Sequence, residues 1–355
     1  MPGIRDFFER NFSDPQVNLL AILLLSGLAV IVFLGDLLAP VLGGLVIAYL
    51  LDSPTQWLVR RGVPHLWAVS LIFVGFLATS LVALVSVVPL LSEQLAQLVY
   101  TLPNMIGDLQ ALLLALPERF PHLVDTEQVD EMMGSLRAEL LNSGQLLVAV
   151  SWDRLGSVIN LLVYAFLVPL VVFFFLKDKQ IIVEWFKSYL PADRGLVREV
   201  AAEMNRRTGD YVRGKAFEIG IVTVASGAAF WAADLHFAML LALLTGLSVL
   251  IPYIGVAVVS IPVTLVALFQ FGVSGPFFVA VGAYIVIQLL DGNLLAPLLL
   301  SEVVQLHPIA VVVAILIFGG IWGFWGLFFA IPLATLADCV LRAWPSAASR
   351  AAASA

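Results

Sequence analysis

Long apolar runs, interrupted at a few points by acids, glycines and prolines, dominate the pattern of this sequence. A helix needs about 20 apolar residues to cross a bilayer, and eight stretches come close to or exceed that length. They cover residues 17–35, 37–58, 66–91, 153–176, 216–234, 237–270, 275–300 and 308–341. Only the short "LGDL" around Asp36 separates the first two, which predicts a tight hairpin there. The pattern therefore predicts an all-α, polytopic transmembrane protein of about eight spans.

Composition supports the membrane interpretation. The 355 residues are 61% hydrophobic and only 12% charged, with a mean hydropathy of +1.02. A soluble domain is closer to half apolar and a quarter charged. We therefore expect the lipid bilayer to surround most of the chain. The net charge of −7 argues against a nucleic-acid partner.

The stretch 92–151 has a different character, because leucines recur at helical spacing with polar residues between them. Pro103, Pro117 and Pro121 are expected to break it into pieces. Amphipathic helices outside the bilayer or on its surface fit this pattern. A small helical soluble subdomain fits it equally well.

Basic residues indicate the orientation. Nine Lys or Arg residues lie between Lys177 and Lys215, and Arg60 and Arg61 close the second run. The positive-inside rule places these regions and both termini in the cytoplasm, with 92–151 outside. The predicted domains are 1–91 (N-terminal arm and three spans), 92–151 (amphipathic helices), 152–215 (fourth span and basic helical segment), 216–342 (transport core) and 343–355 (cytoplasmic tail).

Three of the last four runs contain helix breakers, so each could be a long tilted helix or a re-entrant hairpin. The breakers are Pro252, Gly255 and Pro262; Asp291, Gly292 and Pro297; and Gly319, Gly320, Gly323, Gly326 and Pro332. A broken helix leaves backbone groups unpaired, which hydrocarbon tolerates only where protein or a watery cavity covers them. Transporters use such breaks to bind substrates or ions, whereas a simple proline kink only shapes packing.

The segments "IPYIG" (251–255) and "DGNLLAP" (291–297) are the candidate solute or ion pathway. A charged acid at mid-membrane costs roughly 3 kcal/mol, so Asp291 should face a cavity or partner, or be protonated. Alternatively it lies at a membrane surface and caps the next half-helix. The side chains of Asn293 and Gln288 and the backbone donors freed at Gly292 could hydrogen-bond it. The predicted pathway residues are Pro252, Tyr253, Gly255, Gln288, Asp291, Gly292, Asn293 and Pro297.

We expect the remaining polar residues to have structural roles. Lys215 and Glu218, and Asp338 and Arg342, have the spacing of helical ion pairs at an interface. Asp234 and His236 are expected in an outer turn. The segment "GGIWGFWG" (319–326) has the small residues that let helices approach closely, and its tryptophans are expected to pack.

The sequence gives little support for a disulfide, a metal site or a catalytic site. One cysteine excludes an internal disulfide, and the four histidines are far apart in sequence. No metal-ligand spacing and no paired nucleophile and base appear. We therefore expect no enzyme, no metal and no cofactor.

"IPYIG", "DGNLLAPLLL" and "LHPIAVVVAILIFGGIWGFWGLFFAIPLA" together resemble the autoinducer-2 exporter family of bacterial membrane proteins, the PerM-like permeases. The resemblance covers nearly all of the chain. It implies a multi-pass inner-membrane transporter, either an exporter of the quorum-sensing signal autoinducer-2 or a sodium or lithium/proton antiporter. Where this family usually has Glu, the chain has Asp291, which keeps the charge but moves it by about one methylene.

Three functions follow as hypotheses. The first is a transporter of a small polar solute, with autoinducer-2 as the candidate. The second is a monovalent cation/proton antiporter that uses Asp291. The third is a non-transporting scaffold whose 92–150 segment binds an outside partner. Homo-oligomer formation stays open, because the glycine-rich last span and the amphipathic segment both offer surfaces.

Overall fold

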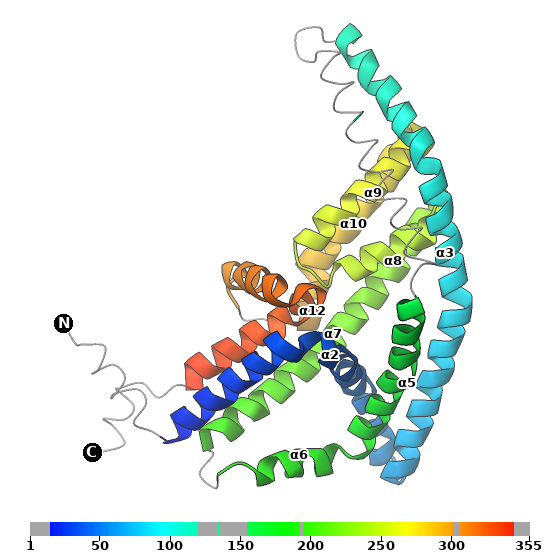
Figure 1. Ribbon diagram of the computed structural model, residues 1–355. Coiled ribbons are helices and arrows are strands. Elements are labelled where there is room, and N and C mark those ends of the chain that lie inside the picture. The colour runs from blue at the N-terminus through cyan, green and yellow to red at the C-terminus, as the bar shows by residue number, and fades with distance from the viewer. Residues whose placement is uncertain (1–14, 120–133, 135–154, 192–194, 301–305, 344–355) are drawn as a thin grey trace, which may run out of the picture. The chain divides into compact units, whose positions relative to one another are not determined.

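The computed structural model of the protein describes residues 15–119, 134, 155–191, 195–300 and 306–343, and the regular secondary structure in these ranges is helical (Figure 1). No strand occurs in these ranges, so the predicted all-α class is confirmed. The helices are α2 (Pro15–Arg60), α3 (His65–Arg119), α5 (Leu155–Lys177), α6 (Lys179–Ser188), α7 (Gly195–Ala232), α8 (Ala238–Ser248), α9 (Ile254–Phe271), α10 (Gly275–Leu290), the π-helical η1 (Asp291–Leu295), α11 (Ala296–Leu300) and α12 (Pro308–Ala343).

Six helical segments in the described part of the chain are long and apolar enough to cross a bilayer. They are Val17–Gly35, Leu37–Arg60, His65–Thr101, Ile254–Phe271, Gly275–Leu300 and Pro308–Arg342. Two shorter apolar helices, Val163–Lys177 and Ala238–Ser248, accompany them. The polytopic prediction is confirmed, and the count of eight spans stays a prediction.

Two predicted interruptions are wrong. Helix α2 continues through Asp36 with no loop, although its axis changes direction along its length (Figure 1), and α3 passes through Pro103 and Pro117 to its end at Arg119. A proline inside a helix removes one backbone hydrogen bond and bends the axis, but it does not have to end the helix. Of the predicted amphipathic stretch 92–151, residues 92–119 belong to α3, whereas the predicted break at Pro121 and most of the later residues lie outside the described ranges.

The chain divides into two compact units, each built from separate stretches of sequence. Unit 1 comprises 1–74, 164–218 and 295–355, and unit 2 comprises 75–163 and 219–294. Helices α3, α5 and α7 and the π-helical η1 contribute residues to both. The predicted five-part division is not tested by this clustering and stays a prediction.

Unit 1 is held together by apolar contacts of α2 with its neighbours. Ala48 of α2 packs with Val69 of α3 and with Val172 and Leu176 of α5. Near the start of α2, Leu20 packs with the buried side chains of Val200 in α7 and Cys339 in α12. Glycines allow closer approach elsewhere on α2: a side chain at Gly35 would overlap the indole of Trp322, and one at Gly44 would press on Val171.

Unit 2 has its own core. Buried apolar side chains from five helices form it, namely Met105 of α3, Phe230 of α7, Leu241 of α8, Val263 of α9 and Tyr284 of α10. Polar side chains secure the helix ends around this core. The side-chain oxygen of Gln94 accepts a hydrogen bond of 2.8 Å from the Leu240 amide near the start of α8. Gln270 of α9 bonds both the Asp234 carbonyl and the His236 amide.

The run 237–270 is a helical hairpin, which settles one alternative that the sequence left open. Helices α8 and α9 pack against each other, and the chain reverses between Val249 and Tyr253. Tyr253 has a φ of 65°, and any side chain at Gly255 would clash with the Ser248 carbonyl oxygen. Pro262 does not interrupt the run as predicted, because it lies inside α9.

Helix α12 also folds back on itself. Trp322 and Gly323 leave the helical conformation, with φ 55° at Gly323 in the left-handed region that favours glycine. A side chain at Gly326 would overlap the Phe318 carbonyl oxygen. Residues eight apart in a straight helix are separated by about 12 Å, so this closeness means that two helical arms meet at the kink. Pro332, a predicted breaker, lies within the second arm and does not end it.

Candidate functional site

A buried polar stripe runs along one face of α10 and η1 in unit 2. Tyr284, Gln288 and Asp291 are spaced at i, i+4 and i+7, so they share one side of the helix. Tyr284 is 3% exposed and Asp291 is 8% exposed. The amide atoms of Gln288 and one carboxylate oxygen of Asp291 are inaccessible to solvent. The stripe places three hydrogen-bonding groups inside an otherwise apolar span.

The Tyr284 end of the stripe contacts the start of α9. The Tyr284 hydroxyl donates a hydrogen bond of 2.7 Å to the backbone carbonyl of Val256. Val256 directly follows Gly255, whose lack of a side chain permits the tight α8–α9 reversal. This hydrogen bond joins α10 to the first turn of α9, directly after the predicted "IPYIG" segment.

The predicted break at Asp291 takes another form. The chain does not unwind there but forms a π turn from Asp291 to Leu295 and continues as α11. A π turn widens the helix by one residue and shifts its hydrogen bonds, so it can accommodate Pro297, which has no N–H to donate. The side-chain amide of Asn293 donates to the Leu289 carbonyl at 2.8 Å and so helps to satisfy the altered backbone.

The eight predicted pathway residues do not converge on one point. Asp291 and Gly255 are buried, and Pro252 and Gln288 are half-buried. The other four, Tyr253, Gly292, Asn293 and Pro297, are exposed. At a rise of about 1.5 Å per residue, Asp291 lies about 10 Å further along the helix axis than Tyr284. The two predicted segments therefore lie at different heights.

Sequence reasoning missed Tyr284, although a signal for it exists. It precedes Gln288 by four residues and Asp291 by seven, which is the spacing of a helical face. Asn293, by contrast, was expected to assist Asp291, but its amide bonds the Leu289 carbonyl. Within the described ranges, no group of three or more His, Cys, Asp or Glu side chains could hold a metal ion.

The other predicted polar contacts form, and their place at a membrane interface stays a prediction. Lys215 Nζ lies 2.8 Å from Glu218 Oε2, and both side chains are buried in protein. Arg342 Nε lies 2.8 Å from Asp338 Oδ2. Asp234 and His236 lie in the turn between α7 and α8. The tryptophans of "GGIWGFWG" pack as expected, since Trp322 and Trp325 both stack on Phe329.

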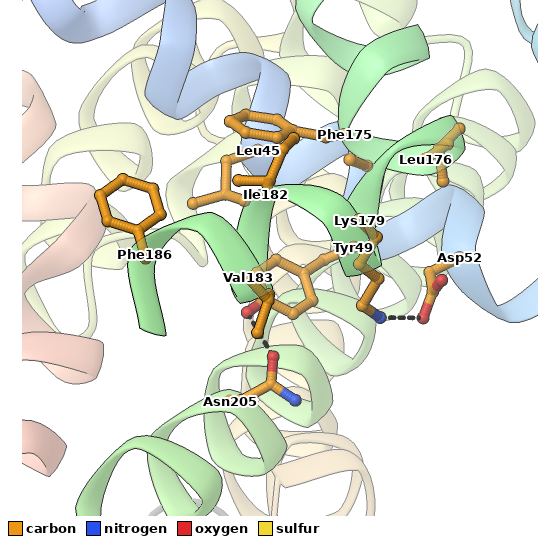
Figure 2. Close-up of a pocket in the computed structure, with 11 residues that line it drawn as sticks. Leu45, Tyr49, Asp52, Phe175, Leu176, Lys179, Ile182, Val183, Phe186 and Asn205 are labelled. Carbon is orange, nitrogen blue, oxygen red and sulfur yellow. Dashed lines mark hydrogen bonds and ion pairs between the residues drawn. The ribbon is translucent and has the colours of Figure 1, made fainter. Parts of the chain in front are cut away.

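Unit 1 holds a cavity of about 300 Å³ between α2, α5, α6 and α7 (Figure 2). Two polar contacts mark one side of it. Tyr49 donates a hydrogen bond of 2.8 Å to Asn205 Oδ1, and Lys179 Nζ lies 2.9 Å from Asp52 Oδ2. The rest of the lining is apolar, as with Leu45 and Phe175. Sequence reasoning did not find this cavity, because it joins residues more than 120 positions apart.

A family model described as AI-2E family transporter matches residues 20–346 of this chain. PerM of Escherichia coli (strain K12), named as a permease, is 43% identical over 342 residues, which cover 96% of this chain and 97% of PerM. YrrI of Bacillus subtilis (strain 168), named as a transport protein, is 28% identical over 82% of each chain. The AI-2 transport protein TqsA of Escherichia coli (strain K12) is 25% identical over 92% of this chain and 93% of TqsA.

The long apolar helices and the buried polar stripe define a polytopic membrane protein with a polar site inside a span. The chain belongs to the AI-2E family transporters, as the resemblance indicated. It is a multi-span membrane protein of a transporter family, and that family is not an enzyme family. The match supports transport over the scaffold hypothesis.

Proposed function

We propose that the protein carries a small polar solute across the bilayer and that the polar stripe of α10 lines part of the path. One observation carries the proposal: Asp291 is a buried acid on a π turn inside the candidate span Gly275–Leu300. An acid within a span is costly in lipid and marks a solute or ion pathway by default. π turns also recur at functional sites.

Autoinducer-2 is the first solute to test, with export as the direction. The support is the name of TqsA, which is a distant relative at 25% identity. PerM, which is more similar to this chain, is named only as a permease. The basic residues from Lys177 to Lys215 support cytoplasmic termini in the bacterial inner membrane.

A second candidate is exchange of sodium or lithium for protons at Asp291. The same buried carboxylate supports it, because a carboxylate can bind a proton and a small cation in alternation. The Gln288 amide, one turn earlier on the same face, offers a further oxygen ligand. If the cations, the protons and the solute all use the polar stripe, cation/proton exchange would be coupled to transport of the solute.

Inverted vesicles with an imposed pH gradient test both candidates. Sodium, lithium or potassium is added to vesicles with wild-type protein, Asp291→Asn or Asp291→Glu, and the gradient is followed with a pH-sensitive dye. The antiporter proposal predicts collapse of the gradient in wild type, loss of the collapse in Asp291→Asn and partial recovery in Asp291→Glu. Asp234→Asn is the matched control, because Asp234 is an exposed acid in a turn of the same unit.

Uptake of labelled autoinducer-2 into the same vesicles tests the solute. Uptake by wild type that Asp291→Asn abolishes and Asp234→Asn retains supports the stripe as its path. Uptake that is equal in all variants would remove Asp291 from the mechanism. Absence of both uptake and gradient collapse, with correctly inserted protein, would overturn both candidates.

A further inference from the structure

The cavity of unit 1 has an apolar interior, although polar groups border it. The Tyr49 hydroxyl is engaged with Asn205, and the Lys179 ammonium is engaged with Asp52 (Figure 2). A small polar solute would have to replace these contacts, because burial of a polar group without hydrogen bonds is unfavourable. An alkyl chain would leave them intact. The interior therefore favours an apolar occupant.

A larger cleft of about 850 Å³ adjoins this cavity and has basic residues along it. Lys179, Val183 and Asn205 line both spaces. Lys187 and Arg198 also line the cleft, and Glu184 is the acid among them. With Asp52 included, three basic groups face two acids, so the combined site has a positive excess suited to an anionic group.

Helix α6 indicates that both spaces lie at the edge of the membrane. It begins directly after the apolar helix Val163–Lys177. The helix and the residue that follows it expose large side chains, with Ile181 66%, Trp185 55% and Tyr189 72% exposed. The Trp185 ring contacts the Tyr189 ring at a centroid distance of 5.1 Å. Aromatic side chains beside lysines are typical of helices that lie in the headgroup region.

We infer that the cavity and the cleft together bind one anionic phospholipid from the leaflet next to α6. One acyl chain enters the cavity between Leu45 and Phe175, and the phosphate lies in the cleft near Lys187 and Arg198. Basic pockets beside spanning helices bind anionic headgroups in this way. The cavity volume is at the lower end of about 300–1,000 Å³ seen for ligand sites, which suits part of a chain. None of the residues that line this site belongs to the proposed transport path at Asp291.

Native mass spectrometry of the full-length protein in detergent tests the inference. The probes are phosphatidylglycerol and phosphatidylcholine with identical palmitoyl and oleoyl chains. Wild type should bind phosphatidylglycerol more tightly. Each basic group near the headgroup contributes about fivefold in affinity, so the double variant Lys187→Gln/Arg198→Gln should lose about 25-fold for phosphatidylglycerol and little for phosphatidylcholine. Lys177→Gln is the matched control, because Lys177 precedes α6 but lines neither space.

A second arm tests the cavity. Leu45→Trp should fill it and weaken both lipids, while glycerol phosphate, which has no acyl chain, should not compete. Leu45→Phe replaces Leu45→Trp if the larger ring prevents folding. Equal affinity of wild type for the two lipids, full competition by glycerol phosphate, or unchanged binding in the cavity and charge variants would each overturn the inference.

Discussion

Lys215 and Glu218 form a buried ion pair one turn apart on α7, with 2.8 Å between Nζ and Oε2. Their side chains are 7% and 2% exposed, so water does little to solvate either charge. Neither residue is in the candidate pathway, and the pair explains how two charged groups are accommodated inside unit 1. Removal of one partner of such a pair is strongly destabilising, because the other charge then stays buried without compensation.

The first prediction concerns this pair. Lys215→Met or Glu218→Leu alone should lower the free energy of unfolding by about 3–5 kcal/mol, because each leaves a buried charge without its partner. The double variant should recover most of the loss. Thermal unfolding in detergent measures this. If the two single effects simply add in the double variant, the pair is not the cause.

Gly326 and Gly320 provide a matched test of the fold in α12. Gly326→Ala should destabilise by about 1–3 kcal/mol, because the added methyl group overlaps the Phe318 carbonyl where the two arms meet. Gly320→Ala, in the same motif, has no atom within 4 Å of the new methyl group. It should be neutral or stabilise by up to about 1 kcal/mol. The thermal unfolding midpoints of both variants test this difference in stability. Equal midpoints would contradict the fold-back at Trp322–Gly323.

Tyr284 should act through its hydroxyl. Tyr284→Phe removes the hydrogen bond to the Val256 carbonyl and should cost about 1 kcal/mol of stability. Tyr253→Phe, at a tyrosine that is 62% exposed, should have no measurable effect. Thermal unfolding of both variants is the measurement. Equal stability of Tyr284→Phe and wild type would mean that the bond to α9 is not needed to hold α10.

Glu203 predicts a pH dependence. Hydrogen bonds from Arg206 and Arg207 lower the pKa of its carboxyl below the ordinary value of 4.5. A lowered pKa in the folded state contributes stability above pH 4.5, and this contribution disappears as the pH falls through the lowered value. As the pH falls from 5 into the range where the Glu203 carboxyl becomes protonated, Glu203→Gln should therefore lose less stability than wild type. Glu199→Gln, an exposed glutamate on the same helix, should keep the wild-type profile. Parallel curves for wild type and Glu203→Gln would contradict the prediction.

The predicted site was only partly recoverable from sequence. Asp291 stands out in the sequence because an acid within an apolar run is costly if that run crosses the bilayer. The form of its surroundings was not predictable, because a π turn and an unwound break both accommodate Gly292 and Pro297. Tyr284 could have been found by helical spacing, but its bond to Val256 depends on how α9 packs against α10.

The sequence by itself determined the membrane class, the helical fold and the local ion pairs. Apolar runs of sufficient length have one stable environment, and residues three or four apart on a helix meet whatever else surrounds them. The tertiary structure alone decided which of the predicted breakers reverse the chain, and it alone joined Tyr49 to Asn205 and Asp52 to Lys179. These outcomes depend on which surfaces fit together, for the two side-chain contacts across more than 100 residues, and local propensity carries no record of that fit.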